Sequence, residues 1–227
     1  MRNLIILLAF ILILFSSCFA PVNLTFESAR NLEKGEIDVQ GSYSRYSDLG
    51  GATSTESNLN QNFGAKLGYG INNWYTIKFR YERLKINTDY HLDSFFSLAP
   101  DYAVVNFYEI ESKFKFPNAN IAIGIPIGYY GIQYSDAPTI GMLSIDPRAY
   151  FTFTNQKNKF EFSVIPKFHI IYDGYYLEYM PGISMGAAFS KDLDKWAIRP
   201  EIGYDGNFSM GICLNINLSK VLKKKGQ

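Results

Sequence analysis

Few side chains in this chain could carry acid–base or nucleophilic chemistry, because its 227 residues include only two histidines and two cysteines. One histidine, His91, lies close in sequence to Asp89, Asp93, Ser94 and Ser97. An acid, an imidazole and a hydroxyl within hydrogen-bond distance of one another form the grouping that catalyses hydrolysis. The same run of residues is typical of a polar loop. We adopt the loop interpretation and keep a hydrolase as the alternative.

The second histidine and the cysteine near the C-terminus give no sign of a reactive site. His169 follows Lys167 by two residues in an alternating segment, where we predict an inward, hydrogen-bonding role, and Cys213 fits as a small filler. No CxxC or HxxxH spacing occurs, so neither a zinc site nor a disulfide framework is predicted. A net charge of +1 provides no global field that would attract nucleic acid. We predict no catalytic residues, no metal and no cofactor.

The N-terminus has the pattern of an export signal over residues 1–17. Arg2 is followed by an apolar run over residues 4–15, which is too short to form a permanent transmembrane helix. The sequence Leu-Phe-Ser-Ser-Cys that ends at Cys18 resembles the lipobox of bacterial lipoproteins. That resemblance implies that Cys18 becomes the lipidated first residue of the mature chain. Ordinary cleavage after Ala20 is the alternative.

From residue 35 onward, apolar and polar residues alternate with the period of two that indicates β-strands. The segment 121–130 is the clearest, because Ile121, Ile123, Ile125 and Ile127 alternate with small residues. The pattern recurs over 35–47, 63–71, 75–82, 108–116, 121–130, 143–153, 159–170, 177–189, 196–204 and 208–218. Several segments reach the length that a tilted strand needs to cross a bilayer. We predict ten strands.

The connections between these segments alternate in length. Those after the second, fourth and sixth segments are tight turns, whereas those after the first and third span roughly residues 48–60 and 87–102. Short turns at one end and longer loops at the other are typical of outer-membrane barrels. The export signal, the even strand count and this asymmetry resemble a bacterial outer-membrane β-barrel. Residues 28–35, Ser-Ala-Arg-Asn-Leu-Glu-Lys-Gly, resemble the lead-in of barrels common in the Bacteroidota.

That resemblance implies an all-β, antiparallel, up-and-down transmembrane barrel. We expect a signal peptide at 1–17, a periplasmic lead-in at 18–34, the barrel at 35–219 and a basic periplasmic tail at 220–227. Outer-membrane lipid, lipopolysaccharide and the barrel-assembly machinery are the expected partners, and we expect a monomer.

Alternation alone leaves open which face points outwards. Bulky side chains share one face, whereas glycines and a balanced set of charges share the other. A narrow lumen requires small residues and paired charges. Aromatic residues also gather near strand ends, as at a membrane interface. We therefore predict that the polar face lines the lumen. A soluble lipocalin-like barrel with the opposite orientation, binding an apolar ligand, is the alternative.

A network of salt bridges is predicted to fill the lumen. Its members are Lys78, Arg80, Glu82, Glu109, Glu111, Lys113, Asp146, Arg148, Lys159, Glu161, Lys167, Glu178, Arg199 and Glu201. If the turn at 155–158 pairs Thr154 with Lys159, Asp146 faces Lys167. Arg80 is expected near Glu109 or Glu111. Prolines at 126, 147, 166, 181 and 200 fall within strands, and we predict a belt of bulges there.

These observations favour a non-catalytic barrel with a structural or surface-exposed role. Ten strands enclose little space compared with porins of sixteen or more strands. A narrow pore for small solutes is the first alternative.

Overall fold

The computed structural model of the protein describes residues 24–47, 60–87, 102–134, 139–155, 157 and 159–222. Its strands are β1 (Ile37–Ser47), β2 (Asn60–Asn72), β3 (Tyr75–Asn87), β4 (Tyr102–Lys115), β5 (Ile121–Tyr134), β6 (Ile140–Ile145), β7 (Arg148–Thr154), β8 (Phe160–Tyr172), β9 (Leu177–Phe189), β10 (Trp196–Tyr204) and β11 (Phe208–Asn217). One short helix, α2 (Leu218–Leu222), follows them. The predicted all-β class is confirmed.

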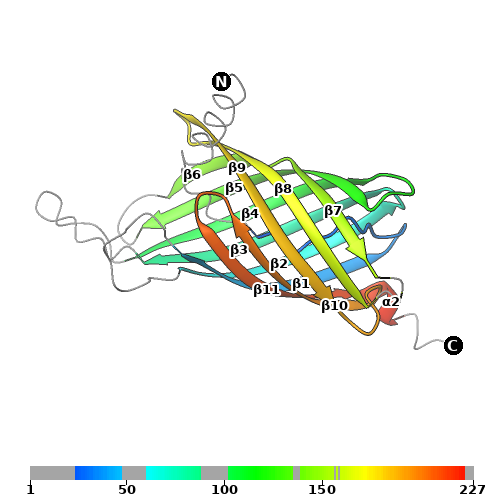
Figure 1. The fold of residues 1–227 in the computed structure, drawn as a ribbon. Helices are drawn as coiled ribbons and strands as arrows, with labels where there is room; N and C mark the ends of the chain where they lie inside the picture. Colours follow the sequence, from blue (N-terminus) through cyan, green and yellow to red (C-terminus); the bar gives the residue numbers. More distant parts are fainter. Residues whose placement is uncertain are drawn as a thin grey trace, which may run out of the picture.

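The strands form one closed antiparallel barrel (Figure 1). Neighbours in the sequence pair with each other, and β1 pairs with β11 to close the circle. β6 and β7 both lie between β5 and β8, so they are two halves of one strand and the eleven strands fill ten positions. The predicted ten-strand, up-and-down barrel is therefore confirmed.

The bulges predicted at the prolines are absent from the described ladders. β5 pairs Ile127 with Ile145 of β6 and Ile123 with Ala149 of β7, so the register is unbroken across Pro147. The ladders also keep register at the other four prolines. Each proline removes a single N–H, and the ladder accepts this loss without inserting a residue. At Pro147 the strand is interrupted between β6 and β7. The Pro147 carbonyl nevertheless accepts a hydrogen bond from Phe168 N at 3.0 Å.

The two faces of the barrel differ sharply in polarity. Large apolar side chains point outwards at mid-strand, as at Ile110 (58% exposed) and Ile127 (59% exposed), whereas charged side chains point inwards and are buried. This is the predicted orientation. It is the reverse of what a lipocalin-like barrel requires, because such a barrel holds its apolar face inside.

The predicted register of the hairpin formed by β7 and β8 is wrong by two residues. Asn155 N donates to Phe160 O at 3.1 Å, and Thr154 pairs with Glu161 rather than with Lys159. The Asn155 side chain also accepts hydrogen bonds from the N–H groups of Lys159 and Phe160, which tightens the turn. Arg148, not Asp146, therefore faces Lys167.

The predicted neighbours of Arg80 are confirmed. Arg80 on β3 pairs in register with Glu109 on β4, and the guanidinium lies 3.9 Å from that carboxylate.

Several predicted segments lie wholly or partly outside the described residues. The structure does not describe the signal peptide, Cys18 or the His91 group. The basic tail is described only as far as Leu222, and Lys220 is not a free solvated lysine, because its ammonium lies 3.2 Å from Glu33 and 3.3 Å from Glu36. Burial alone would lower the pKa of Lys220, but these carboxylates raise that pKa above its usual value.

Candidate functional site in the barrel lumen

Residues 24–32 of the segment predicted as a periplasmic lead-in lie inside the barrel. We call residues 24–32 the plug. Leu24 to Ala29 are each at most 5% exposed, and charged side chains from the barrel wall surround them. The sequence of this segment has no alternation that would mark it as part of the barrel. Inside the lumen, side chains of the wall take the place of water as hydrogen-bond partners of its polar groups.

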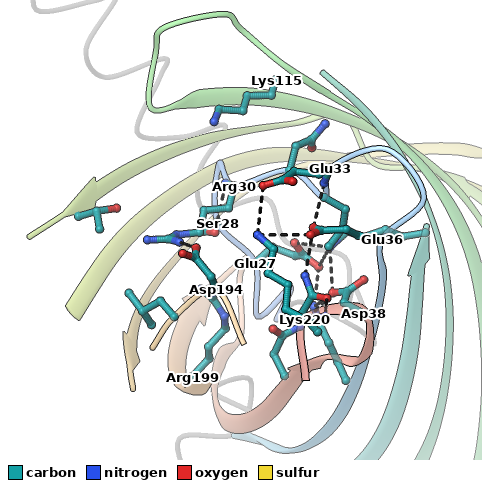
Figure 2. A pocket seen from close by; sticks show the side chains of 18 of the residues that line it. Glu27, Ser28, Arg30, Glu33, Glu36, Asp38, Lys115, Asp194, Arg199 and Lys220 are labelled. Carbon is teal, nitrogen blue, oxygen red and sulfur yellow. Dashed lines mark hydrogen bonds and ion pairs between the residues drawn. The ribbon is translucent and has the colours of Figure 1, made fainter. Parts of the chain in front are cut away.

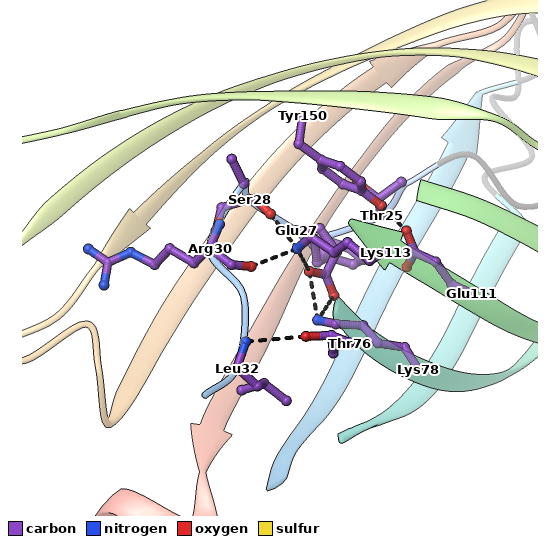
Figure 3. A network of polar contacts seen from close by, with 12 residues as sticks. Thr25, Glu27, Ser28, Arg30, Leu32, Thr76, Lys78, Glu111, Lys113 and Tyr150 are labelled. Atoms are coloured by element: carbon purple, nitrogen blue, oxygen red, sulfur yellow. Dashed lines mark hydrogen bonds and ion pairs between the residues drawn. The ribbon is translucent and has the colours of Figure 1, made fainter. Parts of the chain in front are cut away.

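Glu27 is the centre of the contacts between the plug and the wall (Figure 3). Its carboxylate accepts hydrogen bonds from Lys78 Nζ at 2.7 and 2.8 Å, from Lys113 Nζ at 3.1 Å and from Lys66 Nζ at 3.2 Å. Gln40 Nε2 adds a fourth donor at 3.1 Å. Three ammonium groups from β2, β3 and β4 thus share one buried carboxylate, which offsets the cost of burying them.

The main chain of the plug is held by wall side chains as well. Glu201 on β10 accepts hydrogen bonds from Thr25 N at 2.7 Å and Phe26 N at 2.6 Å. Thr152 Oγ1 accepts one from Ala29 N at 2.7 Å, and Thr76 Oγ1 accepts one from Leu32 N at 3.3 Å. Phe26 has a left-handed backbone with φ of 54°, a conformation that costs a non-glycine residue about 1–2 kcal/mol.

Arg30 connects the plug to the opposite wall. Its guanidinium bonds to Glu161 on β8 and lies 2.7 Å from Asp194 in the turn before β10. Glu161 also pairs with Arg199 on β10 at 2.7 Å. The plug is therefore held on both sides, with Glu27 against a basic cluster and Arg30 against acidic groups.

Most of the other predicted network residues meet one another inside the barrel. Arg148 pairs with Glu109 at 2.7 Å, Arg80 pairs with Glu82, and Glu111 accepts a hydrogen bond from the Tyr150 hydroxyl. Asp146 bonds to His169 Nδ1 at 2.9 Å in place of the predicted lysine. Lys167 is buried as well.

Two predicted members do not belong to the network. Lys159 and Glu178 are exposed, and neither forms an ion pair within the described part of the chain. Lys159 lies in the turn before β8, and Glu178 lies at the first residues of β9, beyond the enclosed part of the lumen. Glu27 belongs to the network but was not among the predicted members. The one feature of the sequence that pointed to it is an acidic residue three positions before the basic Arg30.

Apolar side chains fill the lumen toward the end that carries the longer loops. Tyr46, Leu84, Val105, Phe107 and Tyr130 form one buried cluster, with Ile132 and Met142 packed against it. The Phe107 and Tyr130 rings lie 4.4 Å apart between centroids. We call this cluster the apolar layer. The lumen is thus filled by the apolar layer near the loops, by charges at mid-height and by the plug below them.

A cavity of about 540 Å³ lies beside the plug at the end with the short turns (Figure 2). Plug residues form one side of it, and charged or amide side chains such as Lys115, Asn120, Asp194 and Asn217 line the rest. The amide atoms of Asn31, also on the cavity, are buried without a hydrogen-bond partner. This end of the lumen is therefore polar and partly open, in contrast to the apolar layer.

Two further features bear on the class of site. Among residues 24–222 that the structure describes, no group of acidic, histidine or cysteine side chains is placed to hold a metal ion. Over the same residues, no helix is both long enough and apolar enough to span a membrane.

Replacing Gly70 with alanine should destabilise the barrel by about 1–3 kcal/mol, as overpacking does. A Cβ at this position would lie 2.1 Å from the carbonyl oxygen of Glu33, so the backbone leading out of the plug would have to move. Gly41 is the matched control, because a Cβ there meets no atom within 4 Å. Denaturant unfolding of the two variants measures the difference, and equal stability would contradict the close fit of plug and wall.

No protein-family model and no curated protein matches the sequence. A de novo designed transmembrane β-barrel aligns with 82% of this chain and 98% of its own length, at 12% identity and a TM-score of 0.37. The translocator domain of the autotransporter NalP from Neisseria meningitidis covers 82% of this chain and 89% of its own, at 12% identity and a TM-score of 0.47. The N-terminal β-barrel domain of Pseudomonas aeruginosa OprF covers 82% and 100%, at 9% identity and a TM-score of 0.33.

These likenesses concern the fold alone. The strand order itself defines the class of protein: a closed antiparallel β-barrel. Within that class, this chain is a ten-position barrel whose lumen is occupied by its own residues 24–32.

Proposed function

We propose that the protein is a non-catalytic barrel of the bacterial outer membrane, closed to solutes by its own plug, with a structural or surface-exposed role. The observation that carries this proposal is the filled lumen, in which Glu27 binds three wall lysines and the apolar layer closes the loop end. An open pore needs a continuous aqueous path, and these layers interrupt it.

The exposed apolar belt supports a membrane location. Ile110, Ile127, Leu143 and Leu214 are each at least 47% exposed although they lie on the strands of a folded barrel. Continuous exposed apolar surface of this extent is unfavourable in water and favourable against acyl chains. β4 and β5 have 14 residues each, which exceeds the length of about 9–11 residues that crosses a bilayer. In this reading the short turns and α2 face the periplasm and the longer loops face outwards.

The non-catalytic part of the proposal is supported by the surroundings of His169. Its Nδ1 is engaged by Asp146, and its Nε2 lies 3.7 Å from Asp205 rather than beside a hydroxyl or thiol. An imidazole between two carboxylates links β8 to the connection between β6 and β7 and to the turn after β10, which supports a structural role rather than the activation of a nucleophile. The same proposal includes four further features of the protein. They are contact with lipopolysaccharide, delivery by the barrel-assembly machinery, a monomeric state and a lipid on Cys18.

Planar-bilayer recording tests the closed state directly. We expect the wild-type protein, inserted with a known open porin as insertion control, to give no steady current steps. A variant with residues 24–32 replaced by glycine and serine, and with Phe107 and Tyr130 replaced by alanine, should give small current steps, because the plug contacts and two rings of the apolar layer are then removed while the charged wall stays in place. Steady ohmic steps from the wild-type protein would contradict the proposal and favour the narrow pore.

A further inference from the structure

Many hydrogen bonds between the wall and the plug involve the main chain of the plug, so they do not depend on which side chains the plug carries. Four plug N–H groups (Thr25, Phe26, Ala29 and Leu32) and four plug carbonyls (Leu24, Thr25, Ser28 and Arg30) are bonded by wall side chains. Hydrogen bonds to a peptide's main chain give affinity that does not depend on its side chains, as they do when a strand is added to a sheet edge. The wall of the lumen therefore offers hydrogen-bond partners to the main chain of a peptide, as a peptide-binding groove does.

The specific part of the recognition is confined to a few positions. An acidic side chain at position 27 enters the three-lysine cluster, and a basic side chain at position 30 reaches Glu161. Leu24 and Phe26 pack around Cys213, and Ala29 packs against Ala122, Tyr150 and Ile165. These contacts define a short pattern: apolar residues, then an acid, a small residue and a base three positions after the acid.

The site also has a route of access. The chain leaves the plug at the short-turn end, where Lys34 and Gly35 are exposed, and the cavity of about 540 Å³ lies beside the plug at that end. A second segment could approach there without crossing the apolar layer. The covalent link gives the plug an effective concentration on the order of millimolar, so an outside peptide enters only when the plug is weakened or released.

We propose that the lumen is a peptide-binding site that accepts, in place of its own plug, a segment of another polypeptide with this acid-to-base spacing. This inference rests on the closed barrel proposed above. The plug is then the resident ligand, and Lys66, Lys78 and Lys113 select the acidic residue of the incoming segment.

The test uses the full chain with a recognition sequence for a site-specific protease inserted between Lys34 and Gly35. The protein is folded intact, cut in detergent, and incubated with a fluorescent peptide of residues 24–34. We expect the labelled peptide to exchange into the cut barrel and not into the uncut wild-type barrel. A peptide carrying Glu27→Gln should bind about tenfold more weakly or worse, because charge-assisted hydrogen bonds to the lysines are lost.

The matched control is a peptide carrying Glu33→Gln, which makes the same change of charge at an exposed position and should bind within about twofold of the unaltered peptide. Should the insertion prevent folding, the full chain carrying Glu27→Gln replaces it, since its weakened plug should admit the unaltered labelled peptide. No entry of peptide into either protein, or equal binding of the two altered peptides, would overturn the inference. Current steps from the wild-type protein would overturn the closed barrel alone and leave the peptide result standing.

Discussion

Replacing Glu27 with alanine should destabilise the folded barrel by about 3–5 kcal/mol, the cost typical of removing one partner from a buried ion pair. The substitution leaves the ammonium groups of Lys66, Lys78 and Lys113 without their shared carboxylate at sites that are 0–6% exposed. Lys78 keeps Asp38 at 3.7 Å, so part of the charge stays compensated. The lower half of the range is therefore the expected outcome. Urea unfolding followed by tryptophan fluorescence, in detergent or lipid, measures it.

Two comparisons separate the charge effect from the loss of side-chain volume. Glu33→Ala removes a carboxylate whose side chain is 67% exposed and should cost no more than about 1 kcal/mol. Adding Lys113→Met to Glu27→Ala should restore part of the stability, because one uncompensated buried charge is removed. If Glu27→Ala unfolds at the same urea concentration as the wild-type protein, the three-lysine contact does not stabilise the plug.

Replacing Ile127 with lysine should destabilise the membrane-inserted barrel by about 2–4 kcal/mol, the range for a lysine on the lipid face near the bilayer midplane. Ile127 lies halfway along β5, is 59% exposed and pairs with Ile110 on β4, whose side chain is also exposed. A barrel in water would tolerate the same change within about 0.5 kcal/mol, since the site makes few contacts. The substitution therefore discriminates between the two environments.

The measurement is the unfolding free energy in liposomes of matched composition. Tyr175→Lys is the control, because Tyr175 lies in the connection between β8 and β9 and is 90% exposed, so a lysine there should have little effect. Equal, small effects of Ile127→Lys and Tyr175→Lys would argue against a lipid-facing belt.

The strands and their orientation could be predicted because alternation is a local property. In residues 121–130, each isoleucine and its small neighbour fix two opposite faces whatever the partner strand is. The pairing of Arg80 with Glu109 followed as well, since β3 and β4 are consecutive strands. The pairing of Asp146 could not be predicted reliably, because the side chain of Asn155 set the turn and a shift of two residues preserves both faces of the hairpin.

The sequence by itself determined that polar side chains line a narrow interior, and only the tertiary structure decided what those side chains contact. Glu27 meets lysines that are 39, 51 and 86 residues away, and these come together only when the sheet closes. The plug has no periodic pattern to mark it, and its binding depends on main-chain groups that every residue possesses. A period of two records which face a residue occupies, whereas the occupant of the lumen depends on closure, register and the matching of charges across the barrel.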